Sequence, residues 1–305
     1  MIMKIIKKVI LKIYHIMQCH YWSFRVLVWL KELGITRRIN FFVMCCNGRQ
    51  KKICTNEMER CQNFYEENRE RIVSMMDILS DEKSKIVWEK VMDYRRMRCP
   101  IPRGLYSEHD QYFCRDIIKL CDGEVFVDGG AYTGDTLQQF MDTCKKENVH
   151  YKRIIAFEPD KRNFALISKF YGKRKDIMLI KKGLYRKEAV LSFKEEGVNS
   201  QLNESGECKV DVINVDAISE CRDATFIKMD IEGAEMDALY GAQETIMRNR
   251  PKLAICIYHS NEDMIQIVEY IHSLVPEYKF YIRHHSKSAV ETVAYAVIDK
   301  ERNAV

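Results

Sequence analysis

Two patterns of apolar and polar positions divide the chain. Up to about residue 120, apolar residues recur at steps of three and four, which predicts helices. Asp81 and Ser84 stand where a turn and a helix cap would separate two of these helices. The stretch RCPIPRG at 98–104 holds two prolines and a glycine, so we expect the helical pattern to break there.

From about residue 121 onward, short apolar runs alternate with stretches of helical period. The runs predict strands at 124–128, 153–157, 177–181, 189–193, 225–230, 252–258, 278–283 and 292–298. The intervening stretches predict helices at 135–146, 161–171, 235–249 and 262–274. Such alternation implies a mostly parallel sheet with helices on both faces. Only a short polar connection joins the last two runs, so they should form an antiparallel pair at one edge.

The composition indicates a folded protein without a disulfide framework. Of the 305 residues, 47% are hydrophobic, which is ample for a buried core. The twelve cysteines include no CxxC pair and no zinc-site spacing. We therefore expect reduced thiols in a cytoplasmic protein, and we assign no structural metal.

The charge is distributed unevenly along the chain. Residues 1–56 hold eleven Lys or Arg and one Glu, whereas the whole chain carries a net charge of +5. The longest uncharged stretch near the N-terminus has 12 residues, too few to span a bilayer. This basic amphipathic segment is either a helix packed on the body or, through residues 1–35, a peripheral contact with an anionic membrane. It lacks the interleaved aromatic residues and glycines of an RNA-binding segment, so we expect no nucleic-acid partner.

The stretch EVFVDGGAYTGDT at 124–136 is the first candidate site. Asp128 ends a strand, and Gly129, Gly130 and Gly134 allow a tight turn and a close approach of the backbone to a ligand. An acid at the strand tip is unfavourable beside a pyrophosphate and favourable beside a cation. The turn therefore suits a cofactor with a positive centre and no phosphate, such as S-adenosylmethionine.

The rest of this turn separates it from a dinucleotide fingerprint. Ala131 stands where that fingerprint has its second glycine. Asp135 or Thr136 can cap the following helix, whose N-terminal amides would face the same ligand.

The second predicted strand ends in Glu158, which lies 24 residues past Gly134. A carboxylate at this position can accept hydrogen bonds from both ribose hydroxyls of a nucleoside, and Pro159 stiffens the exit from the strand. NAD would use an acid here too, so Glu158 does not separate the two cofactors.

The densest chemistry lies in FIKMDIEGAEMDAL at 226–239, where a strand delivers Asp230 at its carboxyl end. Ligands of open parallel sheets bind beyond these ends, so Asp128, Glu158 and Asp230 should converge on one crevice. Lys228 shares a strand face with Asp230 and could tune or orient it.

Several stretches together resemble the FkbM family of S-adenosylmethionine-dependent methyltransferases. They are FVDGGAYTGDT, IIAFEPD, FIKMDIEGAEMDALYGA, the ending YKFYIRHHSKSAVETVAYAV, and the preceding ILSDEKSKIVWEKVMDYRRM and SEHDQYF. The resemblance covers roughly residues 60–300. Many members have Val-Gly-Ala-Asn after the first acid, whereas this chain has Gly-Gly-Ala-Tyr, which leaves the cofactor contacts of Tyr132 open.

The resemblance implies an α/β fold of the Rossmann-like class I methyltransferase type, a mostly parallel seven-stranded sheet with an antiparallel terminal hairpin, preceded by a helical N-terminal region. We divide the chain into a basic helical segment at 1–56, a helical region packing on the core at 57–120, and the methyltransferase domain at 121–305. The expected cofactor-binding residues are Asp128, Gly129, Gly130, Ala131, Tyr132, Gly134, Asp135, Thr136, Glu158, Pro159 and Asp230.

The resemblance also implies O-methylation of a small molecule or a sugar. A hydroxyl acceptor needs a general base, and Asp230 is our first candidate, with Glu232 shaping the acceptor pocket. His259, after the strand at 252–258, is the second candidate, and Lys228 would assist Asp230. Asp230 and Glu232 would also suit Mg²⁺, but we assign no metal.

Three alternative functions stay open. An NAD-dependent oxidoreductase would conflict with the glycine spacing and with the edge hairpin. A degenerate methyltransferase that only binds its ligand would not need Asp128, Glu158 and Asp230 intact. A nucleic-acid methyltransferase would find support only in the charge of the basic segment. The sequence indicates neither the acceptor nor the oligomeric state.

Overall fold

The computed structural model describes residues 60–97, 99–193 and 208–298. The predicted basic segment at 1–56 and its membrane contact lie outside these residues. From Phe64 onward the described residues form one compact unit. No helix within the described ranges is both long and apolar enough to cross a membrane.

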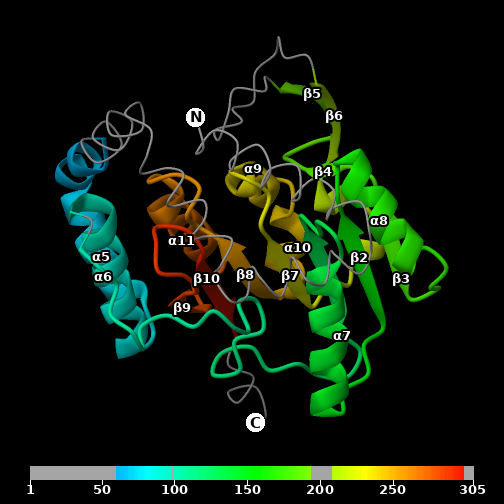
Figure 1. Ribbon diagram of the computed structural model, residues 1–305, viewed down its shortest axis with the longest axis horizontal. Helices are drawn as coiled ribbons and strands as arrows, with labels where there is room; N and C mark the ends of the chain where they lie inside the picture. The colour runs from blue at the N-terminus through cyan, green and yellow to red at the C-terminus, as the bar shows by residue number, and fades with distance from the viewer. Residues whose placement is uncertain (1–59, 98, 194–207, 299–305) are drawn as a thin grey trace, which may run out of the picture. The chain divides into compact units, whose positions relative to one another are not determined.

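A seven-stranded sheet runs through this unit (Figure 1). In spatial order its strands are β3 (Ile177–Ile180), β2 (Arg153–Phe157), β1 (Val125–Gly129), β7 (Phe226–Met229), β8 (Lys252–Cys256), β10 (Thr292–Val297) and β9 (Lys279–His284). Neighbours from β3 to β8 pair in parallel, whereas β10 is antiparallel to both β8 and β9. The predicted sheet is confirmed, with β9 at the edge and β10 inserted beside it.

Helices cover both faces of the sheet. They are α5 (Arg69–Ile78), α6 (Glu82–Met97), α7 (Asp135–Glu147), α8 (Lys161–Tyr171), α9 (Glu235–Tyr240), α10 (Gln243–Asn249) and α11 (Asp263–Leu274). Alternate residues of β1 point to opposite faces. Val127 therefore joins a core with α5, α6, α9, α10 and α11, whereas Phe126 joins a second core with α7 and α8.

The helices before the sheet pack directly against it. Asp81 caps α6, as predicted, by accepting a hydrogen bond from Ser84 N at 2.8 Å. Ser84 Oγ in turn accepts a hydrogen bond from Ile282 N of β9 at 2.9 Å. Trp88 is buried, and its indole donates to Ile72 O at 3.1 Å, which ties α6 to α5.

Two helical predictions differ from the structure. The helix expected at 235–249 is broken into α9 and α10 at Gly241, where an added Cβ would lie 2.2 Å from Tyr185 O. Glycine is thus required where the neighbouring backbone passes. The helical pattern expected up to residue 120 ends at Met97, because prolines follow at 100 and 102, and residues 99–120 form turns and bends.

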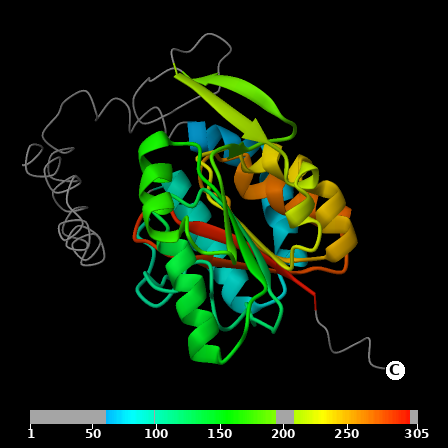
Figure 2. The same cartoon turned by 90° about the vertical axis from the view of Figure 1, so that its right-hand side faces the viewer.

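A second, three-stranded sheet was only partly predicted. Its order is β4 (Gly183–Leu184), β6 (Cys208–Ile213) and β5 (Ala189–Phe193), with β5 and β6 antiparallel. Figure 2 shows β5 and β6 side by side, apart from the larger sheet. Only β5 was expected, although the alternation in CKVDVI is the period-two signal of a strand.

Candidate active site

The glycine turn after β1 is pressed against the end of β7. Gly130 has a φ of 76°, and a Cβ added there would lie 2.0 Å from Asp230 O. Asp230 N donates to Gly129 O at 3.1 Å, and the amides of Gly130 and Ala131 both donate to Phe157 O at 3.0 Å. The turn therefore joins the carboxyl ends of β1, β2 and β7, as the sequence predicted.

The helix cap expected in this turn is different. The N-cap of α7 is Gly134, with a left-handed φ of 87° and no side-chain capping bond, rather than Asp135 or Thr136. The ring of Tyr171 packs where a Cβ of Gly134 would lie, at 2.6 Å. Asp135 occupies the first turn of α7, and Thr136 is buried.

Asp128 forms a buried ion pair with Lys228. Its Oδ1 lies 3.0 Å from Lys228 Nζ, and neither side chain is more than 2% exposed. Lys228 Nζ also donates to Gly129 O at 3.0 Å and Gly130 O at 2.8 Å. Burial alone lowers the pKa of Lys228, but the charges of Asp128 and Asp230 raise it above its ordinary value, so the ammonium is retained. The expected partner of Lys228 was Asp230; the direct contact is with Asp128.

Glu158 fixes the turn from the end of β2. Its carboxylate accepts hydrogen bonds from Tyr132 N and Asp160 N, each at 2.8 Å. Asp160 is the residue that caps α8, through Arg162 N and Asn163 N. Glu158, followed by Pro159, therefore does not cap this helix, and its carboxylate holds the backbone of the turn instead. Its side chain is 6% exposed, whereas Tyr132, at a φ of 48°, is 48% exposed.

Asp230 accepts hydrogen bonds from two phenols. Tyr112 OH donates to Oδ2 at 2.6 Å, and Tyr258 OH donates to Oδ1 at 3.1 Å. Burial alone raises the pKa of Asp230, but the charge of Lys228 and the bond from Tyr112 outweigh it and hold the pKa below its ordinary value. The carboxylate is thus ionised at neutral pH. Sequence reasoning assigned neither tyrosine a role. Tyr112 stands in SEHDQYF, where the resemblance indicated no chemistry, and Tyr258 was only the last residue of the strand expected at 252–258.

His259 lies between the half-buried Asp230 and a buried carboxylate, Glu235. Its Nε2 is 3.5 Å from Asp230 Oδ1 and 3.6 Å from Glu232 Oε2, and its Nδ1 is 3.1 Å from Glu235 Oε1. Burial alone lowers the pKa of His259, but Glu235, Asp230 and Glu232 together raise it to about 9. An imidazolium therefore stands beside Asp230 at neutral pH.

Glu235 is the carboxylate that the sequence analysis placed at a helix start without assigning it a role. It is fully buried and accepts hydrogen bonds from Ile231 N at 2.7 Å and Gly233 N at 3.0 Å. The left-handed backbone of Glu232, with a φ of 58°, belongs to this turn and leaves the Glu232 side chain 88% exposed. Such backbone strain in a non-glycine residue is typical of functional sites.

Asp230, Glu235 and His259 offer ligand atoms that all lie within 4.8 Å of one another. Glu235, rather than Glu232, thus completes the trio with metal-ligand spacing. Both Glu235 oxygens already accept a backbone N–H, and protonated His259 supplies positive charge to the cluster. The two ring nitrogens of His259 form no hydrogen bond of standard geometry with the described residues, so the imidazolium contacts the carboxylates through its charge.

The comparisons with known proteins point to one family. A family model described as the methyltransferase FkbM domain matches residues 128–285, just over half of the chain. The crystal structure of a methyltransferase FkbM from Methylobacillus flagellatus KT superposes with a TM-score of 0.66 at 25% sequence identity. The match covers 77% of this chain and 60% of that one, so the chain spans about three fifths of that protein.

Two other solved structures share only a weak likeness. An rRNA methylase from Streptococcus thermophilus has 16% identity and a TM-score of 0.36, over 59% of this chain and 90% of its own. Fibrillarin from Aeropyrum pernix, in complex with natively bound S-adenosyl-L-methionine, has 12% identity and a TM-score of 0.38. The match covers 63% of this chain and 74% of the fibrillarin chain. No curated protein matches the chain.

The family model takes in the glycine turn, the Glu158 edge and the Asp230 cluster. The strand order and the antiparallel β10 are those of the expected class I methyltransferase fold. The chain therefore belongs to the FkbM methyltransferase family.

Proposed function

We propose that the protein transfers a methyl group from S-adenosylmethionine to a hydroxyl of a sugar or another small molecule. The observation that carries the proposal is the contact of the glycine turn with the end of β7. It places a turn that only glycine can form against Asp230, an ionised carboxylate beside a protonated histidine. In this proposal the turn belongs to the donor side and Asp230 to the acceptor side.

The residues at the turn fit the chemistry of this cofactor. Glu158 keeps lone pairs on both oxygens besides its two backbone bonds and would accept the ribose hydroxyls. The clustered carboxylates of Asp230, Glu232 and Glu235 favour a ligand with positive charge. S-adenosylmethionine, when bound, supplies a methyl carbon activated by its positive sulfur.

The chain's own groups would orient the acceptor and receive its proton. Asp230 is the base that we propose, because its carboxylate is ionised and held in place from both sides. Glu232, largely exposed, would contribute to the acceptor pocket. His259 is less suited to accept a proton than Asp230, since its pKa of about 9 keeps it protonated at neutral pH.

Titration calorimetry tests the cofactor. We expect S-adenosylmethionine to bind to the wild-type protein and NAD not to bind. Binding of NAD without binding of S-adenosylmethionine would overturn the proposal in favour of an oxidoreductase.

Substitution tests the proposed base. Asp230→Asn should retain cofactor binding and lose transfer of labelled methyl groups to a panel of methyl glycosides and simple alcohols. If transfer to the accepted compound continues at the wild-type rate, Asp230 is not the base.

A further inference from the structure

An irregular segment outside the matched domain reaches into the site. Residues 99–120 contain no helix and precede the family match, which begins at residue 128. Tyr112 of this segment is only 8% exposed, and its hydroxyl is the 2.6 Å donor to Asp230. Lys228 Nζ lies 4.9 Å from the centre of the Tyr112 ring. The segment thus forms one wall of the acidic cluster.

Contacts on both sides of Tyr112 hold this segment in place. His285 Nδ1 lies 2.7 Å from Ser107 O, and its Nε2 lies 2.9 Å from the hydroxyl of Tyr295. The same hydroxyl is also in hydrogen-bond contact with Gln111 O, so its one proton is shared between the two acceptors. The residue next to Tyr112 is therefore fixed through the buried interior of the β9–β10 hairpin.

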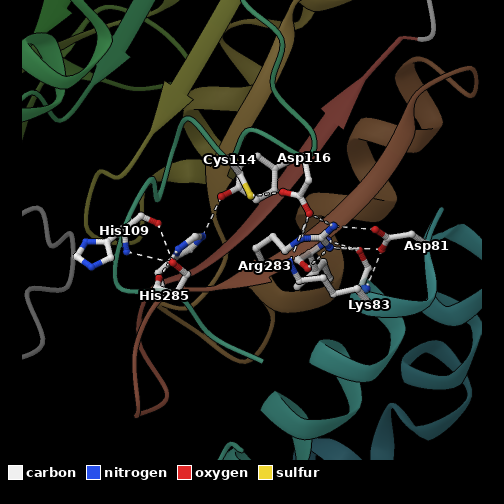
Figure 3. Close-up of polar contacts among 11 residues, drawn as sticks. Asp81, Lys83, His109, Cys114, Asp116, Arg283 and His285 are labelled. Carbon is white, nitrogen blue, oxygen red and sulfur yellow. Dashed lines mark hydrogen bonds and ion pairs between the residues drawn. The ribbon is translucent and has the colours of Figure 1, made fainter. Parts of the chain in front are cut away.

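An ion-pair cluster fixes the other side of the segment. Figure 3 shows Arg283 of β9 with its guanidinium between Asp116 and Asp81. Arg283 Nη2 donates to Asp116 Oδ2 at 2.8 Å and to Asp81 Oδ2 at 2.7 Å. The side chain of Arg283 is 5% exposed, whereas those of Asp81 and Asp116 are 34% and 45% exposed. A buried guanidinium is costly to leave without its carboxylate partners. The segment is thus held on both sides of Tyr112, at Ser107 and Gln111 before it and at Asp116 after it.

We propose that Tyr112 is a positioning residue of the transfer site, which orients the Asp230 carboxylate through its hydroxyl. The inference rests on the proposed role of Asp230 as the base. Tyr112 and Tyr258 bind different oxygens of Asp230, so together they fix the rotation of the carboxylate. A fixed oxygen can then face the acceptor, and such orientation is a large part of what an enzyme supplies.

The pH dependence of Asp230 reflects every group around it. Its titratable and charged neighbours are Lys228 on β7, Asp128 at the end of β1, Cys256 on β8, Tyr258 and His259 after β8, Glu232 before α9, Glu235 at the start of α9, Glu291 before β10, and Tyr112. Tyr112→Phe leaves all of the other groups in place. The variant removes one hydrogen bond to the ionised carboxylate, so the pKa of Asp230 should rise.

The experiment compares Tyr112→Phe with Tyr151→Phe. Tyr151 donates to Asp176 at the same 2.6 Å, and Asp176 lies just before β3, outside the acidic cluster. We expect Tyr112→Phe to lower turnover about 10- to 100-fold with little change in S-adenosylmethionine affinity. The acid limb of its pH–rate profile should move to higher pH. Tyr151→Phe should leave turnover and the profile unchanged.

A readout without turnover separates this inference from the proposed function. The NMR titration of the Asp230 side-chain carboxyl should move to higher pH in Tyr112→Phe whether or not a cofactor binds. An unchanged titration in a folded variant would overturn the inference. If the wild-type protein binds no S-adenosylmethionine but the titration moves, the proposed function fails and the contact stands. If Tyr112→Phe does not fold, Arg283→Lys replaces it. This variant loses the simultaneous hydrogen bonds to Asp81 and Asp116, so the titration of Asp230 should again move to higher pH. No movement in that variant would overturn the inference.

Discussion

At the scale of single residues, the ion pair of Asp128 and Lys228 changes the interpretation of Asp128. The sequence placed an acid at the tip of β1 and expected a positively charged ligand there. In the structure the positive charge nearest Asp128 belongs to Lys228. The role of Asp128 in cofactor binding stays a prediction. In the structure Asp128 contacts Lys228, whose ammonium donates hydrogen bonds to the carbonyls of Gly129 and Gly130.

Lys228→Met should destabilise the protein by about 3–5 kcal/mol, because it leaves the Asp128 carboxylate buried and uncompensated. Urea unfolding measures the change. Lys152→Met is a matched control, since it removes an ion pair with Asp223 whose side chains are about half exposed. That control should cost less than about 1 kcal/mol. Equal losses in the two variants would contradict this account.

His259 should make the stability depend on pH in the alkaline range. Its pKa rises from 6.5 to about 9 on folding, so the proton binds the folded state more tightly. The resulting stabilisation is fully present below about pH 6.5 and is lost as the pH rises through about 9. The difference in unfolding free energy between the wild type and His259→Gln should therefore shrink between about pH 6 and about pH 10. His150→Gln, at an exposed histidine, serves as the control; a constant difference for His259→Gln would refute the linkage.

At the scale of elements, periodicity located most strands and helices but not their interruptions. Strand β2 and helix α8 have the predicted bounds, because their apolar spacing and flanking polar residues are local signals. The break between α9 and α10 depends on the backbone of Tyr185, which is 56 positions earlier in the chain than Gly241. No local pattern reports such a contact. The missed strand β6 is a different case, because the alternation in CKVDVI is a local signal of a strand that the prediction did not use.

The turn after β1 should tolerate no side chain at Gly130. In Gly130→Ala the new Cβ would meet Asp230 O at 2.0 Å, and the left-handed backbone adds strain. Gly104→Ala is the matched control, because Gly104 also has a left-handed φ, of 95°, with no atom within 4 Å of an added Cβ. The control should lose only the roughly 1–2 kcal/mol of left-handed strain, and Gly130→Ala should lose clearly more. Denaturant midpoints of the two variants give the comparison, and equal midpoints would show that the turn is not tightly packed.

At the scale of the whole molecule, the described helices before the sheet share its core. Residues of α5 and α6 pack in the same buried cluster as Val127 of β1 and Ile282 of β9. The helical region around α6 therefore supports the edge of the sheet that carries Arg283 and His285. The same edge anchors the segment of Tyr112, so the stability of this region and the geometry of the site are linked.

Trp88→Ala should cost about 3–5 kcal/mol, because Trp88 is 1% exposed and fills the core between α5, α6 and the sheet. Thermal unfolding followed by far-UV and near-UV circular dichroism should show one shared transition at a lower temperature than in the wild type. Ile86→Ala, on the exposed side of α6, should change the midpoint little. Separate transitions for the two signals would show that the helices and the sheet unfold independently.

The sequence by itself determined the sheet, its helical layers and the residues at the carboxyl ends of β1, β2 and β7. These follow from local periodicity, from glycine spacing and from the rule that parallel strands gather their carboxyl ends at one edge. Only the tertiary structure decided which polar side chains contact one another: Lys228 with Asp128, His259 with Glu235, and Tyr112 with Asp230. Tyr112 and Asp230 are 118 positions apart, and their contact depends on how a segment without regular structure is held against β9. Pairings of this kind are set by packing in three dimensions, and a one-dimensional pattern carries no signal for them.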